Sequence, residues 1–323
     1  MIKKVIKRTK KLLNKSRTES VRDKKGIVYH GLLFAFVLVL FLILAVDIGF
    51  QKYNAKNQVL GVPIFANVSE YPLLSKSHFP EIYAKAALVM DNDSKVVLFA
   101  KNPNLLFSMA STAKIMTALV ALDYYKLDDV LTIKTEGIGG ITIGFKKGQK
   151  VLFGDLLIAM LLPSSNDAAI AVAQNYKGGE DAFIDKMNEY AKRLNLFNTK
   201  FADPAGLDGA DYTTAIELAT LSSFAIKNEI FSQVVAKKQA VISSMDGKSS
   251  YSISNINKLL GVDGINGIKT GFTNEAGQVL VGSKTSDGHT LISVVMNSKD
   301  RFSDTKKILD YTSINLNYLS IHP

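Results

Sequence analysis

The chain lacks cysteine and tryptophan entirely and has only four histidines among its 323 residues. The absence of cysteine excludes a disulfide framework and fits an oxidising or thiol-hostile compartment. The histidines are His30, His78, His289 and His322, and none of them accompanies a serine motif. A Ser-His-Asp triad is therefore disfavoured, and a serine nucleophile in this chain needs a different base.

The formal net charge of +10 is concentrated at one end of the chain. Residues 1–25 hold eleven Lys or Arg against two acidic residues, a net charge of +9, which leaves about +1 for the remaining 298 residues. We therefore predict a basic tail, residues 1–26, in place of a basic body that binds nucleic acid. No nucleic-acid partner is expected.

A run of twenty residues without Asp, Glu, Lys or Arg follows the tail, from Ile27 to Val46. In a helix this run covers about 30 Å, the thickness of the hydrocarbon core of a bilayer. The sequence predicts a single transmembrane anchor over residues 27–48, with the tail in the cytoplasm and the rest of the chain outside the membrane. The alternative, a cleaved signal peptide, is disfavoured because residues 44–47 offer no clean Ala-x-Ala site.

Residues 49–80 mix polar residues with three prolines and show no sustained period, which predicts a linker before a folded domain over residues 81–320. Two hairpins are predicted, 86–90 with 95–100 and 278–284 with 290–296. Helices are predicted over 111–125, 155–162, 180–194, 214–227 and 301–315, with another that restarts at Asp167. Five glycines within residues 130–152 predict hairpin turns, because the cluster lacks the setting of a phosphate loop. The pattern predicts an α/β (α+β) fold, an antiparallel sheet whose terminal strands meet, covered by helices.

Three short motifs follow one another in the folded domain. They are S-x-x-K at Ser111 and Lys114, S-x-N at Ser164 and Asn166, and K-T-G over residues 269–271. Each motif alone is weak, since Ser303 begins a second S-x-x-K. K-T-G occurs once in the chain. The inference that the three motifs form one site therefore depends on their order and on the elements predicted around each of them.

These residue types can build an acyl-transfer site without histidine. Ser111 and Lys114 share one face of the predicted helix, and the free N–H groups of its first turn suit an oxyanion. Lys114 must be neutral to act as a base, and we expect burial and the charge of Lys269 to lower its pKa. Ser164 is placed to relay a proton, and Asn166 to hold a substrate amide.

The third motif follows a stretch rich in turn-forming residues. If it starts an edge strand, Gly271 leaves room for a peptide to add alongside. Lys269 and the hydroxyl of Thr270 then suit a substrate carboxylate. Helix capping or an exposed turn remains the alternative for each motif taken alone.

The segments ASTAKIMTAL, LLPSSNDAAIAVAQ and GINGIKTGFTNEAG resemble the penicillin-binding D-alanyl-D-alanine carboxypeptidases of the S11 serine peptidase family. The likeness covers about residues 80–318, including AKNPN before the first motif and RFSDTKKILDY near the end. It implies a five-stranded antiparallel sheet, as in β-lactamases and penicillin-binding proteins. It also implies peptidoglycan stem peptides as substrates, β-lactams as covalent inhibitors, and no metal or cofactor.

The resemblance also implies a role for each motif residue. Ser111 is the acylated nucleophile and Lys114 its base, Ser164 and Asn166 form the second element, and Lys269, Thr270 and Gly271 the third. The oxyanion hole uses the backbone N–H groups of Ser111 and Phe272, and Arg301 matches an arginine that helps to recognise the terminal carboxylate. Many relatives carry a second β-rich domain and a C-terminal membrane helix, whereas here the anchor is predicted at the N-terminus.

Two other functions stay open at this point. A class A β-lactamase uses similar motifs, but it also needs a carboxylate that activates the deacylating water, usually within a Glu-x-x-x-Asn segment. No such segment lies between Asn166 and Lys269. Slow deacylation of a bound β-lactam is therefore expected. A non-catalytic, membrane-tethered β-lactam sensor or wall-binding module is the other alternative, and the intact motif residues disfavour it.

Overall fold

The computed structural model describes residues 70–75 and 78–320. The predicted basic tail and the predicted anchor lie outside the described residues, as does most of the predicted linker. Within the two described ranges, no helix is long and apolar enough to cross a bilayer.

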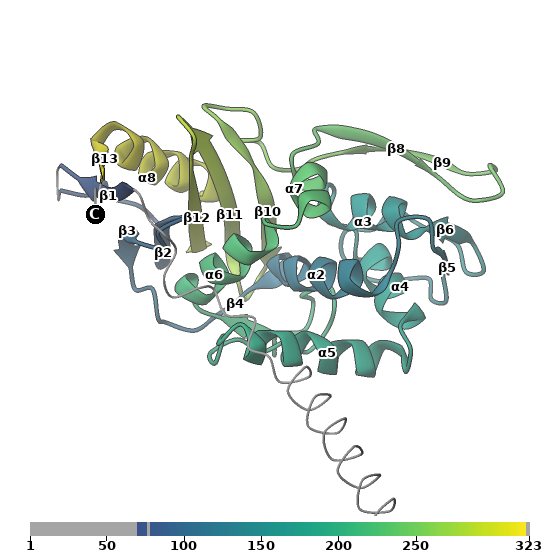
Figure 1. Ribbon diagram of the computed structural model, residues 1–323. Coiled ribbons are helices and arrows are strands. Elements are labelled where there is room, and N and C mark those ends of the chain that lie inside the picture. Colours follow the sequence, from purple (N-terminus) through teal and green to yellow (C-terminus); the bar gives the residue numbers. More distant parts are fainter. Residues whose placement is uncertain (1–69, 76–77, 321–323) are drawn as a thin grey trace, which may run out of the picture. The chain divides into compact units, whose positions relative to one another are not determined.

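A five-stranded antiparallel sheet forms the centre of the described part (Figure 1). Its order is β10-β11-β12-β2-β3, so the predicted hairpins at the two ends of the domain meet where β12 pairs with β2. The strands are β2 (Ala86–Asp91), β3 (Val97–Lys101), β10 (Ile265–Thr273), β11 (Gly277–Ser286) and β12 (His289–Ser298). Both predicted hairpins and the predicted fold class are confirmed.

Helices cover both faces of this sheet because its buried strands are apolar on both sides. Along β2, Ala86 and Leu88 belong to a core shared with α2, α3, α4 and α6, whereas Ala87 and Val89 pack in a second core with α8. The helices are η1 (a 3-10 turn, Ala110–Ala113), α2 (Lys114–Tyr124), α3 (Phe153–Leu161), α4 (Asn166–Asn175), α5 (Gly179–Arg193), α6 (Ala215–Ala225), α7 (Glu229–Val235) and α8 (Arg301–Asn315).

Four two-stranded sheets complete the described part. They pair β1 (Glu70–Leu74) with β13 (Leu316–Ser320), β4 (Phe107–Ser108) with β7 (Tyr212–Thr213), β5 (Val130–Thr132) with β6 (Lys150–Leu152), and β8 (Gln239–Ser243) with β9 (Ser250–Ser254). The β8–β9 hairpin lies beside α3 at the helical end of the described part (Figure 1).

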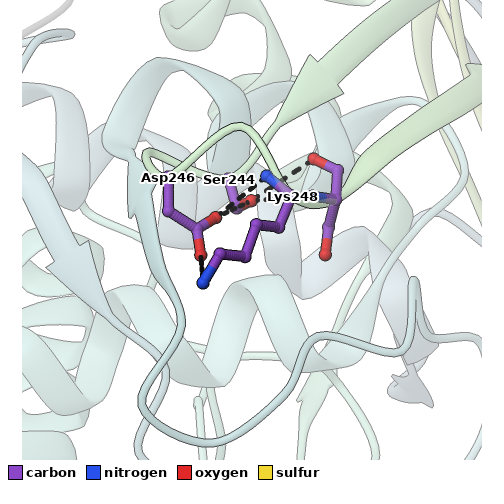
Figure 2. A network of polar contacts seen from close by, with 4 residues as sticks. Ser244, Asp246 and Lys248 are labelled. Carbon is purple, nitrogen blue, oxygen red and sulfur yellow. Dashed lines mark hydrogen bonds and ion pairs between the residues drawn. The ribbon is translucent and has the colours of Figure 1, made fainter.

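Polar side chains close the turn of the β8–β9 hairpin (Figure 2). Ser244 Oγ donates to Asp246 Oδ1 at 2.6 Å, and the backbone N–H of Lys248 donates to the same oxygen at 3.1 Å. The ion pair between Lys248 Nζ and Asp246 Oδ2 is 3.8 Å long and well exposed, so it adds little to stability. The two hydrogen bonds to Asp246 Oδ1 therefore fix this turn.

Three predictions about the fold are wrong in part. Strand β1 lies inside the predicted linker; its partner β13 is distant in sequence, so no local pattern predicts the pair. The predicted helix over residues 111–125 begins with a 3-10 turn, because Ala110 has a left-handed backbone (φ 45°) and α-helical geometry starts at Lys114. The predicted hairpin turns over residues 130–152 are one strand pair joined by a long loop, residues 133–149.

Candidate active site

Ser111 and Lys114 meet at the junction of η1 and α2. The Lys114 side chain is fully buried, and its Nζ lies 3.0 Å from Ser111 Oγ. Nζ also lies 2.8 Å from Asn166 Oδ1 and 2.6 Å from the backbone oxygen of Ala205. One amine therefore joins the first motif, the second motif and a loop that no motif marked.

These three contacts fix where the lone pair of a neutral Lys114 amine points. The Ala205 carbonyl can only accept hydrogen bonds, and so can Asn166 Oδ1, because Asn166 Nδ2 donates to Gly139 O at 2.7 Å. A neutral amine has two N–H donors, which these two acceptors occupy. Its lone pair is left facing Ser111 Oγ, which is the orientation that a general base for this hydroxyl requires.

Burial lowers the pKa of Lys114 to about 7. The nearby carboxylates Asp203, Asp211 and Asp167 act in the opposite direction. Burial also lowers the pKa of Lys269 well below its usual value, with the charges of Lys114 and Arg301 acting the same way. Burial is thus the first cause at both lysines, and a substantial fraction of Lys114 is neutral near pH 7.

The second motif occupies the link between α3 and α4, where Pro163 ends the first helix. Ser164 has a left-handed backbone (φ 74°), which is uncommon for a residue other than glycine. Its Oγ is buried and has no hydrogen-bond partner. Asn166 opens α4 and is held by a 2.7 Å bond from its backbone N–H to Ile141 O. The link is held in a strained form that leaves one hydroxyl unpaired.

The glycine-rich loop, residues 133–149, forms one wall of the site and is anchored by Asp167. The Asp167 carboxylate accepts backbone hydrogen bonds from Ile143, Gly144 and Phe145 at 2.9–3.2 Å. A Cβ on Gly140 would lie 2.6 Å from Asn166 Nδ2. The loop is thus fastened to the first turn of α4 and lies directly against the second motif.

The third motif lies in β10, the edge strand that the sequence predicted, although in its second half. Lys269 is buried, and its Nζ donates to Thr270 O at 3.0 Å. Thr270 Oγ1 is buried and has no partner. A Cβ on Gly271 would approach Met109 O, Ala110 Cβ and Ser111 N to 3.2–3.3 Å. Glycine at 271 therefore lets the edge strand lie close to η1 and the nucleophile.

Arg301 and Phe272 lie at the outer end of this strand. Arg301 begins α8, and its Nη1 donates to Gly271 O at 2.7 Å, while its Nε is buried without a partner. The Phe272 side chain is 61% exposed. Both residues line the same cleft as Ser111, so the structure brings the predicted arginine to the site.

The cleft has a volume of about 240 Å³. Seven of the nine predicted site residues line it: Ser111, Ser164, Asn166, Thr270, Gly271, Phe272 and Arg301. The remaining two, Lys114 and Lys269, are buried beneath its surface. In the part of the chain that the structure describes, five buried side-chain polar atoms lack a hydrogen-bond partner, and three of them belong to lining residues: Ser164 Oγ, Thr270 Oγ1 and Arg301 Nε. The cleft is thus built to give hydrogen bonds to something it does not itself contain.

Sequence reasoning missed the loop over residues 202–211. Gly206 has φ 75°, and a Cβ there would lie 2.0 Å from Ala110 O. Asp203, Pro204 and Gly206 are a turn-forming cluster, a signal that was available. The contact that matters, Ala205 O with Lys114, uses a backbone atom and has no side-chain signature.

The sequence profile of peptidase family S11, D-alanyl-D-alanine carboxypeptidase, matches residues 74–300. The chain belongs to this family. It is a serine-type D-Ala-D-Ala carboxypeptidase by family, and its relatives include endopeptidases. The family and activity class predicted from the motifs are therefore confirmed.

Two curated relatives and one solved structure illustrate the match. A D-alanyl-D-alanine endopeptidase of Pseudomonas aeruginosa is 32% identical over 77% of this chain and 85% of the relative. D-alanyl-D-alanine carboxypeptidase DacF of Bacillus subtilis is 31% identical over 71% of this chain and 61% of the relative. The crystal structure of the Streptomyces K15 DD-transpeptidase is 33% identical, with a TM-score of 0.67, and the match covers 74% of this chain and all of that one.

Proposed function

We propose that this S11 peptidase removes the terminal D-alanine from peptidoglycan stem peptides through an acyl-enzyme on Ser111. The observation that carries the proposal is the pairing of Lys114 Nζ with Ser111 Oγ at 3.0 Å, with both N–H donors of the neutral amine occupied elsewhere. This arrangement supports proton transfer from Ser111 to Lys114 as the hydroxyl attacks.

The reaction has two halves. Ser111 Oγ bonds to the carbonyl carbon of the penultimate D-alanine while its proton passes to Lys114, and the backbone N–H groups of Ser111 and Phe272 stabilise the oxyanion. The peptide C–N bond then breaks, and the leaving amine receives a proton by way of Ser164. A water molecule next attacks the ester carbonyl, and one of its protons passes to Ser111 Oγ as the shortened peptide leaves.

The substrate lies along β10 in this proposal, as an added strand whose carboxylate faces Arg301, Thr270 and Lys269. Support comes from the unpaired Nε of Arg301 and the unpaired hydroxyl of Thr270, which are donors suited to a carboxylate. Asn166 Nδ2 lies at the opposite wall, where it contacts the glycine-rich loop. A free terminal carboxylate distinguishes a carboxypeptidase substrate from an internal cross-link.

β-Lactams acylate the same serine in this proposal, and their release is slow. The sequence has no Glu-x-x-x-Asn between Asn166 and Lys269 to activate a deacylating water. A β-lactamase and a non-catalytic sensor are the competing functions. Assays with a pentapeptide ending in D-Ala-D-Ala and with penicillin separate them. Release of D-alanine from the peptide supports the carboxypeptidase, and fast turnover of penicillin supports the β-lactamase. Stable penicillin labelling without D-alanine release supports the sensor.

We also propose that residues 27–48 anchor the enzyme in the cytoplasmic membrane, with residues 1–26 in the cytoplasm and the peptidase domain outside. The uncharged run and the basic tail before it support this topology. Because the chain has no cysteine, single cysteines report topology cleanly. In intact cells an impermeant maleimide should label Val241→Cys, an exposed site on β8, and reach Ser20→Cys only after lysis. The reverse pattern would refute the topology.

The decisive experiment for the enzyme is mass spectrometry of the penicillin adduct. We expect a single acyl group, mapped by peptide digestion to Ser111. An adduct on another residue, or none with excess penicillin, would overturn the proposal.

A further inference from the structure

The loop over residues 202–211, here called the acid-pair loop, presents two consecutive backbone oxygens to α2. Thr117 Oγ1 donates to Pro204 O at 2.6 Å, and Lys114 Nζ donates to Ala205 O at 2.6 Å. The next residue, Gly206, packs against Ala110 of η1. The position of this loop therefore decides where the proposed base finds one of its two acceptors.

A single carboxylate shapes the turn of the acid-pair loop. Asp203 Oδ1 accepts from the backbone N–H groups of Ala205 and Gly206 at 2.6 and 2.8 Å, and Oδ2 accepts from Leu207 and Asp208 at 2.8 and 2.5 Å. Burial acts to raise the pKa of Asp203, but these hydrogen bonds bring it below its usual value. Asp203 is therefore the charged member of the loop.

A second carboxyl group, Asp211, lies beside Asp203 and is fully buried. Its Oδ1 accepts from Ala202 N at 2.7 Å, whereas Oδ2 is buried and receives no donor from any described residue. Asp203 is its hydrogen-bond neighbour, and that group is already an acceptor for four N–H groups. A protonated Asp211 can donate to Asp203, whereas a charged Asp211 would place a second buried negative charge beside it with one oxygen unpaired, so the arrangement favours a protonated Asp211.

We propose that Asp203 and Asp211 share one proton, and that this acid pair positions the Ala205 carbonyl against Lys114 and loses that function at alkaline pH. Both aspartates are positioning residues, since they act on the base through the loop and through their charge. The inference rests on the proposed role of Lys114 as the base for Ser111.

The pH at which the pair ionises follows from its surroundings. Burial and the charge of Asp203 raise the pKa of Asp211 to about 8, with the N–H of Ala202 acting in the opposite direction. Other charged groups around the loop are Asp208 on the loop itself, Glu275 against Gly209, Lys114 on α2 and Asp167 on α4. Above this pKa the pair carries two negative charges. They repel each other, and the additional charge raises the pKa of Lys114.

The consequence is a fall in acylation on the alkaline side. Near neutral pH the pair carries one negative charge, and the neutral fraction of the base is correctly oriented. When the shared proton is lost, Lys114 regains affinity for a proton and the Ala205 carbonyl is no longer held in place. The raised pKa of Lys114 adds little at this pH, because the amine stays mostly neutral well above its pKa, so the loss of orientation accounts for the fall. A drop of about threefold to tenfold is expected, a fraction of the about 10²–10⁴-fold that a general base contributes.

The test compares the pH profile of penicillin acylation in the full-length protein and in its Asp211→Asn variant, from about pH 6 to pH 10. Asparagine keeps an N–H donor toward Asp203 and cannot ionise, so it mimics the protonated state. With each profile normalised to its own maximum, the wild type should fall on the alkaline side and Asp211→Asn should stay flat. The same alkaline fall in both proteins would overturn the proposal.

Two controls make the result specific. Asp208→Asn removes an exposed charge from the same loop and should keep the wild-type profile; a flat profile there would refute the assignment to Asp211. If Asp211→Asn does not fold, infrared spectroscopy of the wild type should detect a buried carboxylic acid at neutral pH that is lost as the pH rises above 8. A spectrum without this carboxylic acid band at neutral pH would refute the shared proton. Failure of the wild type to acylate at Ser111 would instead count against the proposed function.

Discussion

The two sides of the cleft differ in how completely their polar groups are paired. On the base side, Lys114 Nζ has three partners and Asn166 has a partner for each side-chain polar atom. On the substrate side, Thr270 and Arg301 each keep one buried polar atom without a partner, and so does the proposed relay Ser164 beside Asn166.

This difference separates groups that must be oriented before the substrate arrives from groups that bind it. An unpaired buried polar atom costs about 1–3 kcal/mol in a folded protein, so three in one cleft are a sizeable destabilisation. Binding removes that penalty only for a ligand with matching polar atoms. The base side carries no such penalty, because its partners come from the fold. Selectivity is thus assigned to the unpaired groups and orientation of the base to the paired ones.

Ser111→Ala removes the nucleophile and gives the largest expected effect. Covalent penicillin labelling and D-alanine release should both vanish, with the fold intact, because Ser111 is only partly buried and lies in a short 3-10 turn. Mass spectrometry and thermal unfolding measure the two outcomes. The chain supplies its own control in the second S-x-x-K: Ser303→Ala on α8 should label normally. Labelling that survives in Ser111→Ala would disprove the nucleophile.

Lys114→Ala breaks the base side and should slow acylation by about 10²–10⁴-fold, the usual contribution of a general base. The measurement is the second-order rate constant for penicillin. Lys306→Ala is the matched control, since Lys306 pairs on the surface with Asp263 and Asp310. A near-normal rate in Lys114→Ala would remove the lysine from the base role.

Arg301→Leu tests the substrate side and should spare the base. A peptide ending in a carboxylate should lose about 10–100-fold in kcat/KM, the effect of one lost charged hydrogen bond. The same peptide ending in a carboxamide serves as the control for the Arg301–Gly271 bond, and it should lose less. Equal losses for both peptides would show that Arg301 only holds β10 in place.

The wild-type acylation rate should rise with pH through the pKa of Lys114, about 7. The base must be neutral, so the rate falls by about tenfold for each pH unit well below this pKa, and it levels off above this pKa until the acid pair ionises. Acylation rates measured below and above pH 7 test this rise, and thermal unfolding at each pH shows whether the protein stays folded. A rate that does not change across neutrality would place the pKa of the base elsewhere.

The sequence predicted the chemistry of the cleft better than the backbone that presents it. Motif order predicted seven of the nine candidate site residues, and the family resemblance added Phe272 and Arg301. The structure brings seven of the nine to one cleft and buries Lys114 and Lys269 beneath it. The acid-pair loop was missed because Ala205 acts through its backbone oxygen. The central sheet was predicted because its hairpins are local, whereas β1 and β13 pair across almost the whole domain.

The left-handed backbone of Ser164 is the clearest example of a feature that the sequence does not predict. Pro163 predicted that a helix ends before it, and the structure has α3 end at Leu161. Nothing in the residue itself predicts a left-handed backbone, since serine seldom adopts one. Two backbone hydrogen bonds hold the chain directly after it: Ser165 N donates to Ala159 O, and Asn166 N donates to Ile141 O.

Substitutions of Ser164 and Ser165 give the smallest expected effects. They compare an unpaired hydroxyl with a paired one through the free energy of unfolding. Ser164→Ala removes an unpaired buried hydroxyl and should raise the free energy of unfolding by about 1 kcal/mol while slowing acylation. Ser164→Gly should be at least as stable, because relief of the left-handed strain offsets the about 0.5–1 kcal/mol that glycine loses in chain entropy.

Ser165→Ala is the matched control for both variants. Ser165 Oγ donates to Asp167, so this variant loses a made hydrogen bond and should be destabilised by about 1–3 kcal/mol. Urea unfolding of the four proteins gives the comparison. Destabilisation of Ser164→Ala to the same extent as Ser165→Ala would mean that the Ser164 hydroxyl is paired in the folded enzyme. The proposed relay would then be bonded before the substrate arrives, and the contrast between paired and unpaired groups would depend on Thr270 and Arg301 alone.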